Sequence, residues 1–189
     1  MARSRVRVYI ACSLDGFIAG TDNDLSWLHD ESNPPPATPP EGAVGFEDFM
    51  ADVGAMLMGR STFDVVHGFD VPWPYGQRPV LVATHRDMPA DAPEPTRAAT
   101  GDIHALVQAA KEAADGKDVY VDGGQMVRQA LDAGLIDELI VTIAPIILGQ
   151  GLPLFAGTQQ RHRLELVNTC PFGGDMVQMT YKPVSKNTP

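Results

Sequence analysis

Three short runs that combine glycine, hydroxyl and charged side chains follow three apolar, β-branched runs. They are residues 59–62 (Gly-Arg-Ser-Thr), 84–86 (Thr-His-Arg) and 122–125 (Asp-Gly-Gly-Gln). If each apolar run is a strand of a parallel sheet, the polar runs lie at its carboxyl edge, where the next helix begins. A helix N-terminus offers free N–H groups to an anion, and glycine lets a ligand approach the backbone. The pattern favours a site for a dinucleotide pyrophosphate and one extra phosphate.

None of the three runs is a standard phosphate motif. The Gly123-Gly124 pair lacks the G-x-G-x-x-G spacing, and residues 59–62 lack the glycine run and the lysine of a Walker loop. Backbone geometry is the simpler explanation for any one of these glycines. Their joint occurrence after three predicted strands is what points to a bound dinucleotide.

Three acidic residues are candidates for a proton donor. Hydride transfer to a C=N or C=O bond requires such a donor beside the reacting atoms, and Asp15, Glu47 and Asp48 have the right chemistry. Asp15 precedes a glycine, so a role in the turn explains it equally well. Glu47 and Asp48 fall in a predicted helix, where at least one is expected on a solvated face, and the choice between them stays open.

The elements that position these residues are predicted from hydrophobic periodicity. Short β-branched runs alternate with amphipathic stretches, which indicates an α/β fold with a largely parallel sheet. The expected strands in this part are 5–12, 55–58, 79–84 and 119–121, and the expected helices are 45–52, 62–67, 103–114 and 125–133. The last strands, 138–144, 164–169 and 176–182, have no helix between them, so an antiparallel end of the sheet is expected.

Composition narrows the class of protein. The chain has 189 residues, with 24 acidic side chains against 14 Lys and Arg, and a formal net charge of -10. Nucleic acids and anionic membranes require clustered basic residues, so both are excluded as partners. The 44% of apolar residues predict one globular domain over 1–189 with a core of about 5–182. No signal-like or membrane-spanning run is present at the N-terminus, so a cytoplasmic location is expected.

Cysteine, histidine and proline carry less information. Cys12 and Cys170 are interpreted as reduced, buried thiols. The five histidines lack zinc-ligand spacing, so no metal is expected. Residues 33–41 include five prolines and favour an extended surface loop, with a flap over a ligand cleft as the alternative.

Several short motifs, in order along the chain, resemble the dihydrofolate reductase-like superfamily. They are residues 13–19 (Ser-Leu-Asp-Gly-Phe-Ile-Ala), 58–63 (Met-Gly-Arg-Ser-Thr-Phe), 121–124 (Val-Asp-Gly-Gly), 135–138 (Leu-Ile-Asp-Glu), 145–151 (Pro-Ile-Ile-Leu-Gly-Gln-Gly) and 154–155 (Leu-Phe). Within the superfamily, the chain is most similar to the reductase domain of bacterial riboflavin biosynthesis and its stand-alone relatives. The resemblance implies a three-layer fold with a mixed, mostly parallel sheet, helices on both faces and an antiparallel C-terminal end.

The resemblance also implies NADPH as the cofactor, bound across the carboxyl edge of the sheet. The residues that would hold its phosphates are Gly59, Arg60, Ser61 and Thr62, with Arg60 toward the 2′-phosphate and Thr84, His85 and Arg86 sharing that role. The residues that would lie against the pyrophosphate and ribose are Gly123, Gly124, Gln125 and Met126, and those facing the nicotinamide carboxamide are Ala11 and Ile18. In these relatives the glycine pair includes a cis peptide bond, so one is expected at 122–123 or 123–124. A homodimer is implied as well, with the C-terminal strands as its seam.

The expected substrate wall departs from the family pattern. Residues 8–59 contain nine acidic side chains and no Lys or Arg. Folate and a phosphoribosyl group both call for a basic clamp, which this segment lacks. Ser13, Trp27 and Phe46 are candidate substrate contacts, and the aromatic pair would suit a flat, uncharged or cationic ring, although core or rim positions explain aromatic residues as well.

The sequence therefore predicts an NADPH-dependent reductase of a small heterocyclic or carbonyl substrate. The activity that the resemblance suggests is that of 5-amino-6-(5-phosphoribosylamino)uracil reductase in riboflavin biosynthesis. Two alternatives stay open at this point: a related reductase of another small molecule, and a non-catalytic NADP-binding dimer.

Overall fold

The structure, a computed structural model, describes residues 4–28 and 38–184. Its main sheet contains β1 (Val6–Ser13), β3 (Val53–Gly59), β4 (Val80–Ala83), β5 (Thr96–Ala99), β6 (Asp118–Asp122), β7 (Glu138–Ala144), β9 (Leu164–Gly173) and β10 (Met176–Pro183). The helices are α1 (Phe46–Asp52), α2 (Arg60–His67), α3 (Ile103–Ala113) and α4 (Gly124–Asp132), with two 3₁₀ turns at Thr21–Asn23 and Ser26–Leu28. A separate two-stranded sheet pairs β2 (Phe17–Ala19) with β8 (Leu152–Pro153). The proline-rich segment predicted as a loop or flap lies mostly outside the described residues, since only 38–41 of it are included.

The main sheet is parallel from one edge through its centre and antiparallel at the other edge. Its strand order is β5-β4-β3-β6-β1-β7-β10-β9. The pairs from β5 to β7 are all parallel, whereas β7–β10 and β10–β9 are antiparallel. The predicted α/β class and the antiparallel C-terminal end are therefore confirmed.

Helices cover both faces of the sheet and create two apolar clusters. Helices α3 and α4 pack on one face with Val8, Leu57 and Val121, while α1 and α2 bring Phe49 and Phe63 to the other face. Central strands buried on both faces need continuous apolar runs rather than alternation, which is what residues 55–58 and 119–121 supply.

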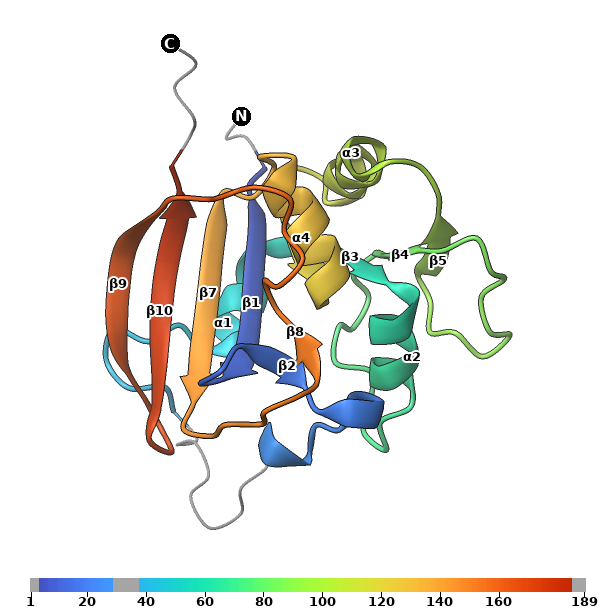
Figure 1. Cartoon of the computed structure of the whole chain (residues 1–189). Helices are drawn as coiled ribbons and strands as arrows, with labels where there is room; N and C mark the ends of the chain where they lie inside the picture. Colours follow the sequence, from blue (N-terminus) through green and yellow to red (C-terminus); the bar gives the residue numbers. More distant parts are fainter. Residues whose placement is uncertain (1–3, 29–37, 185–189) are drawn as a thin grey trace.

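The parallel arrangement places one end of every central strand at the same edge. In Figure 1, β1 and β7 both point toward the end of the molecule at which β2 and β8 lie, whereas β1 begins and β10 ends at the opposite end. Helix α2 starts directly where β3 ends, and α4 starts just after β6. The three polar runs singled out in the sequence therefore come to this shared edge.

Candidate active site

A cavity of about 1170 Å³ lies at the carboxyl edge of the parallel strands. Its walls come from the ends of β1, β3, β4 and β6, from the first residues of α1, α2 and α4, and from the β2–β8 sheet. A space of this size at this position matches the place where open α/β sheets bind ligands. The cavity is therefore the candidate active site.

Most of the residues predicted for a cofactor or substrate site line this cavity. They are Ala11, Ile18, Phe46, Glu47, Asp48, Gly59, Arg60, Ser61, Thr62, Gly123, Gly124, Gln125 and Met126. The predicted residues that are not part of its lining are Ser13, Asp15, Trp27, Thr84, His85 and Arg86. The structure thus brings two of the three polar runs together at one space and leaves the third beside it.

The first of these runs begins helix α2. Its N-cap is Gly59, in an extended conformation, and no side chain caps the free N–H groups of the first turn. A Cβ built on Gly59 meets no atom within 4 Å, so packing does not explain the glycine. The missing side chain leaves open space beside uncapped N–H donors, which fits a phosphate group.

Arg60, the first residue of α2, is held at the cavity wall by two acceptors. Its Nε donates to Asp64 Oδ1 at 2.6 Å, and Nη1 donates to the Asp87 carbonyl at 2.8 Å. Arg86 approaches the other oxygen of Asp64, with Nη2 at 3.4 Å. Two guanidinium groups therefore converge on one carboxylate next to the cavity, where an added phosphate would compete with Asp64 for them.

The second run begins helix α4, and it contains a correction. A cis peptide bond was expected at 122–123 or 123–124, and this prediction is wrong, because the cis bond in the described part of the chain is Glu94–Pro95. The turn is made instead by a left-handed glycine: Gly123 has φ of 85° and is the uncapped N-cap of α4. A Cβ on Gly123 would also collide with the Thr62 hydroxyl, so the two uncapped helix starts touch each other.

Asp122, at the end of β6, is a site residue that was not predicted as a proton donor from the sequence. It lines the cavity, and its Oδ1 accepts a hydrogen bond of 2.7 Å from the Gly123 N–H. Burial raises the pKa of this carboxyl to about 6, against the lowering effect of that hydrogen bond. The clue in the sequence was an acid directly before Gly-Gly at a strand end, which we assigned to the phosphate turn alone.

Tyr120, two residues earlier on β6, contributes to the surroundings of Asp122. The Tyr120 hydroxyl donates to the Tyr9 carbonyl at 2.7 Å, and both tyrosines line the cavity. Burial and the Asp122 carboxylate raise the pKa of Tyr120, so its hydroxyl keeps its proton. Among these cavity groups, Asp122 is the one whose pKa is moved into the neutral range, as expected of a general acid.

Arg128, on the next turn of α4, is a second cavity residue that was not predicted. Its Nη1 donates to the Pro153 carbonyl at 2.6 Å and to the Leu154 carbonyl at 3.2 Å. Strand β8 is thereby tied to α4 across the cavity. A long-range link of this kind leaves no signal in the sequence, because the partners are 25 and 26 residues away.

The start of helix α1 supplies the acidic wall. Phe46, Glu47 and Asp48 line the cavity and are exposed to it, with 38% of Phe46 accessible. The rings of Phe46 and Tyr9 lie 5.8 Å apart, which extends an aromatic surface beside the two carboxylates. Both acids, between which the sequence could not choose, therefore reach the same space.

Asp15 and Ser13 lie beside the cavity in a hydrogen-bonded turn. The Asp15 carboxylate accepts from the Ser13 hydroxyl at 2.6 Å, the Gly149 N–H at 2.7 Å and the Leu148 N–H at 3.1 Å. These bonds, that from Ser13 first, lower the pKa of Asp15. Ser13 is fully buried and accepts from the Phe17 N–H as well. This geometry favours the turn-forming interpretation of Asp15, since an anchored carboxylate of lowered pKa is a poor proton donor at neutral pH.

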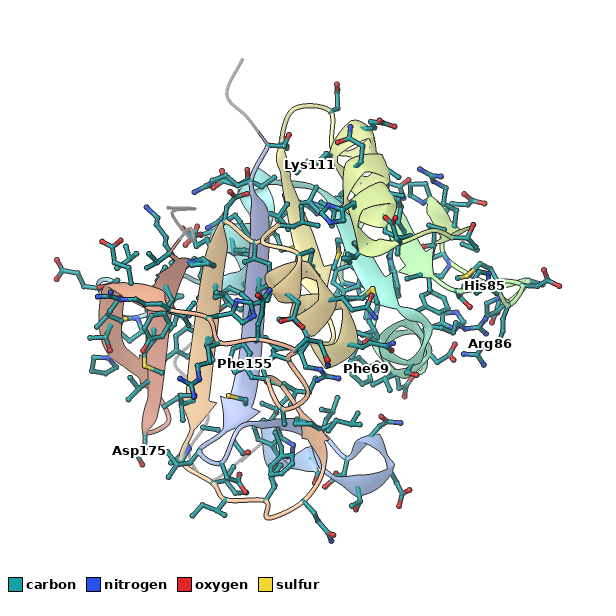
Figure 2. The ribbon with its side chains drawn as sticks, turned by 45° about the horizontal axis from the view of Figure 1, so that its top comes forward. Phe69, His85, Arg86, Lys111, Phe155 and Asp175 are labelled. Atoms are coloured by element: carbon teal, nitrogen blue, oxygen red, sulfur yellow. The ribbon has the colours of Figure 1, made fainter. Side chains whose placement is uncertain are left out.

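The third polar run and Trp27 also lie outside the lining. The Thr84 hydroxyl accepts from the Arg86 N–H at 3.0 Å, and His85 and Arg86 are exposed. Figure 2 shows these two side chains together at the edge of the molecule, on the α2 side of the sheet. Trp27 donates its indole N–H to the Asp24 carbonyl at 3.2 Å, and its neighbours Leu25 and Leu28 face the cavity instead.

Residues 4–28 and 38–184 contain neither a cluster of metal ligands nor a membrane-spanning helix. No group of three or more His, Cys, Asp or Glu side chains in these ranges is arranged to hold a metal ion. No helix there is long and apolar enough to cross a membrane. Cys12 and Cys170 are free and buried, and burial raises the pKa of the Cys12 thiol to about 11.

The fold and the position of the cavity define a dihydrofolate reductase-like protein. The dihydrofolate reductase of Enterococcus faecalis has the same fold, with a TM-score of 0.62 and 16% identity over 97% of this chain and 98% of that one. More specifically, the chain belongs to the RibD C-terminal domain family, whose sequence model matches residues 4–178.

Two relatives are considerably more similar in sequence. YwjB of Bacillus subtilis (strain 168), a protein of uncharacterized function, is 31% identical over 175 residues, which are 92% of this chain and 95% of YwjB. A crystal structure from Shewanella sp. PV-4, provisionally assigned to riboflavin biosynthesis, is 32% identical with a TM-score of 0.82, over 96% of this chain and 99% of that one. Membership of this reductase family confirms the resemblance inferred from the motifs.

Proposed function

We propose that this protein is an NADPH-dependent reductase that transfers a hydride to a C=N or C=O bond of a small substrate. The observation that carries the proposal is that one cavity contains the uncapped N-termini of α2 and α4, which touch each other, and an acidic side chain with a pKa of about 6. The first feature suits the phosphates of a dinucleotide, and the second suits a proton donor.

The residues present fit the cofactor. The N–H groups at the starts of α2 and α4 would hold its phosphates, the open space at Gly59 would receive one of them, and Arg60 would turn toward the 2′-phosphate. NADPH, when bound, supplies the hydride. Ala11 and Ile18, which line the cavity from β1 and β2, would contact its nicotinamide end.

Asp122 would deliver the proton. With a pKa of about 6, the carboxyl holds a proton on about a tenth of the molecules at pH 7, roughly a hundred times the fraction for an ordinary aspartate. Burial of this carboxyl, with Tyr120 beside it, limits access of water. Asp122 would donate this proton to the atom next to the carbon that accepts the hydride.

Cofactor binding and turnover test the proposal separately. NADPH at 100 times its dissociation constant should stabilise the folded chain by about 2.7 kcal/mol, measured as a thermal shift. Absence of any shift would remove the cofactor from the proposal. Binding without loss of NADPH absorbance, over a panel of pyrimidines, pterins and carbonyl compounds, would favour a non-catalytic NADP-binding protein instead.

Replacement of Asp122 tests its role. Asp122→Asn should lower kcat by about 10² to 10⁴ and leave NADPH affinity within a few-fold, because the amide oxygen can still accept from the Gly123 N–H. In the wild type, kcat should fall as pH rises through about 6, since the protonated carboxyl is the active form. An unchanged kcat and pH profile in the variant would assign the proton to another group.

Stability serves as the folding control for this variant. The pKa of Asp122 is higher in the folded chain than the usual 3.8, so the folded state binds this proton more tightly than the unfolded state does. Wild-type stability should therefore decrease as pH rises from about 4 to about 6, and Asp122→Asn should be the more stable protein at pH 8.

We also propose that two copies of the chain associate through the β9–β10 hairpin. Leu166, Val167 and Val177 on these strands are 52%, 49% and 41% exposed, and β9 is an edge strand. Apolar side chains on an exposed edge are usually covered by a partner. Light scattering of Leu166→Asp, against the wild type, should show a dimer converted to a monomer.

A further inference from the structure

The charge distribution within the cavity indicates what kind of substrate it takes, if the reductase function proposed above holds. We define its substrate half as the lining away from the starts of α2 and α4, formed by Tyr9, Leu28, Phe46, Glu47, Asp48 and Phe172. This half combines aromatic and aliphatic side chains with two carboxylates. We infer that the substrate is a flat ring compound, neutral or positively charged, that carries neither a phosphate nor a carboxylate group.

The substrate half carries two acidic side chains without a counter-charge in the described part of the chain. Glu47 and Asp48 come from the first turn of α1, and their carboxylates have no hydrogen-bonding or ionic partner among the described residues. Neither charge is neutralised by a neighbouring cation of the described chain. Asp122 is a third acid in the same cavity.

The described residues of the substrate half include no cation that could receive an anionic group of the substrate. Among the described lining residues, only Arg60 and Arg128 are basic, and both belong to the α2 and α4 side. Arg60 is bound to Asp64 and to the Asp87 carbonyl, and Arg128 is bound to the Pro153 and Leu154 carbonyls. A phosphate or carboxylate on the substrate would enter the acidic half without a basic partner.

The sequence between the two described ranges contains no Lys or Arg that could serve as the missing cation. Residues 8–59 contain no Lys or Arg at all, so the stretch between the described ranges adds none. Burying an anion beside like charges without a partner is costly, because Coulomb repulsion adds to the loss of hydration. A phosphoribosyl substrate, as in the activity that the resemblance suggests, therefore does not suit this wall.

The aromatic side chains of the substrate half favour a flat ring. Tyr9 and Phe46 lie 5.8 Å apart with their rings tilted by 59°, and Phe172 and Leu28 complete an apolar surface around them. Aromatic surfaces of this kind pack against flat rings, and their faces attract cations. Acidic side chains at the edge of such a surface would accept hydrogen bonds from ring N–H or amino groups.

A charge probe inside the cavity tests the inference without a known substrate. Phe46→Cys places a thiol beside Glu47 and Asp48, and Gln108→Cys, at an exposed position of α3, provides a thiol outside the cavity. The rates of modification by a cationic and an anionic methanethiosulfonate are compared, with the wild type as background because Cys12 and Cys170 are buried. The cation-to-anion ratio should be about tenfold higher at position 46 than at position 108.

Matched charge variants assign that ratio to the two carboxylates. Adding Glu47→Gln and Asp48→Asn to Phe46→Cys should bring the ratio close to that of position 108. Adding Glu165→Gln, which removes a negative charge from the exposed edge strand β9, should leave it unchanged. Equal ratios at positions 46 and 108, or a preference for the anionic reagent, would overturn the inference.

Binding of three compounds of one shape extends the test to substrate class. Benzamidine, benzamide and benzoate are flat and of similar size but carry positive, zero and negative charge. Calorimetry should show benzoate binding at least tenfold more weakly than benzamide or benzamidine, and benzoate binding as tightly as benzamide would refute the inference. If none of the three compounds binds, the ratio of modification rates at positions 46 and 108 alone supports or overturns the inference. Because neither measurement uses NADPH, failure of the cofactor assignment would appear separately, in the thermal shift described above.

Discussion

Helices α2 and α4 begin differently from helix α3. The N-caps of α2 and α4 are Gly59 and Gly123, and no side chain caps the first N–H groups of either helix. The N-cap of α3 is Asp102, whose carboxylate accepts from the Ala105 N–H at 2.9 Å. Both α2 and α4 begin at the cavity, as does the short helix α1 with its uncapped Gly45, whereas the capped helix α3 does not line it.

This difference shows where the chain leaves hydrogen-bonding capacity for a ligand. An Asp, Asn, Ser or Thr N-cap stabilises a helix by about 1 kcal/mol relative to alanine. Glycine adopts the N-cap backbone conformation almost as well, but it has no side chain that could accept from the first N–H groups. Because α3 is capped and α2 and α4 are not, N–H donors remain available at the cavity. An anionic ligand there would accept hydrogen bonds from the first N–H groups of both helices. Variants that alter one helix start at a time should separate its role in stability from its role in ligand binding.

Capping α2 with its own carboxylate should have the largest effect. In Gly59→Asp the new side chain has open space, accepts from the first-turn N–H groups and places a negative charge where a phosphate is expected. Stability should rise by only about a few tenths of a kcal/mol, since glycine is itself a good N-cap residue, while NADPH affinity should fall about a hundredfold.

Gly59→Ala is the matched control for this variant. Its methyl group also has open space, so the chain should fold, and the loss of NADPH affinity should be much smaller than with Asp. NADPH titrations and thermal melts of both variants provide the measurement. Equal NADPH affinity in Gly59→Asp and the wild type would show that no phosphate binds at this helix start.

Replacing Arg60 should have a smaller and more selective effect. Arg60→Ala should weaken NADPH binding about tenfold and leave NADH binding nearly unchanged, because only NADPH carries the 2′-phosphate. Asp64→Asn should act in the opposite direction, since Asp64 now competes for the Arg60 guanidinium at 2.6 Å. Equal losses for the two cofactors would rule out Arg60 as the 2′-phosphate ligand.

The sequence predicted the fold better than it predicted the site. Buried parallel strands and amphipathic helices have strong periodic signals, whereas β5 (Thr-Arg-Ala-Ala) is a half-exposed edge strand and β8 contains proline, so neither was expected. The glycine runs at the starts of α2 and α4 could be recognised because their chemistry is local. The raised pKa of Asp122 and the anchoring of Asp15 by Leu148 and Gly149 could not be recognised in the sequence, because both depend on residues that only folding brings together.

Removing the cap of α3 should have the smallest effect and completes the comparison. Asp102→Ala deletes the carboxylate that accepts from the Ala105 N–H, so the free energy of unfolding should fall by about 1 kcal/mol. NADPH affinity should be unchanged, because α3 lies outside the cavity. Denaturant unfolding and NADPH titration measure the two quantities. Asp102→Ala should lose stability and keep its NADPH affinity, whereas Gly59→Asp should gain stability and lose NADPH affinity. A loss of NADPH affinity in Asp102→Ala would mean that a helix start outside the cavity also affects cofactor binding, so that capping does not distinguish the ligand-binding helices from the rest.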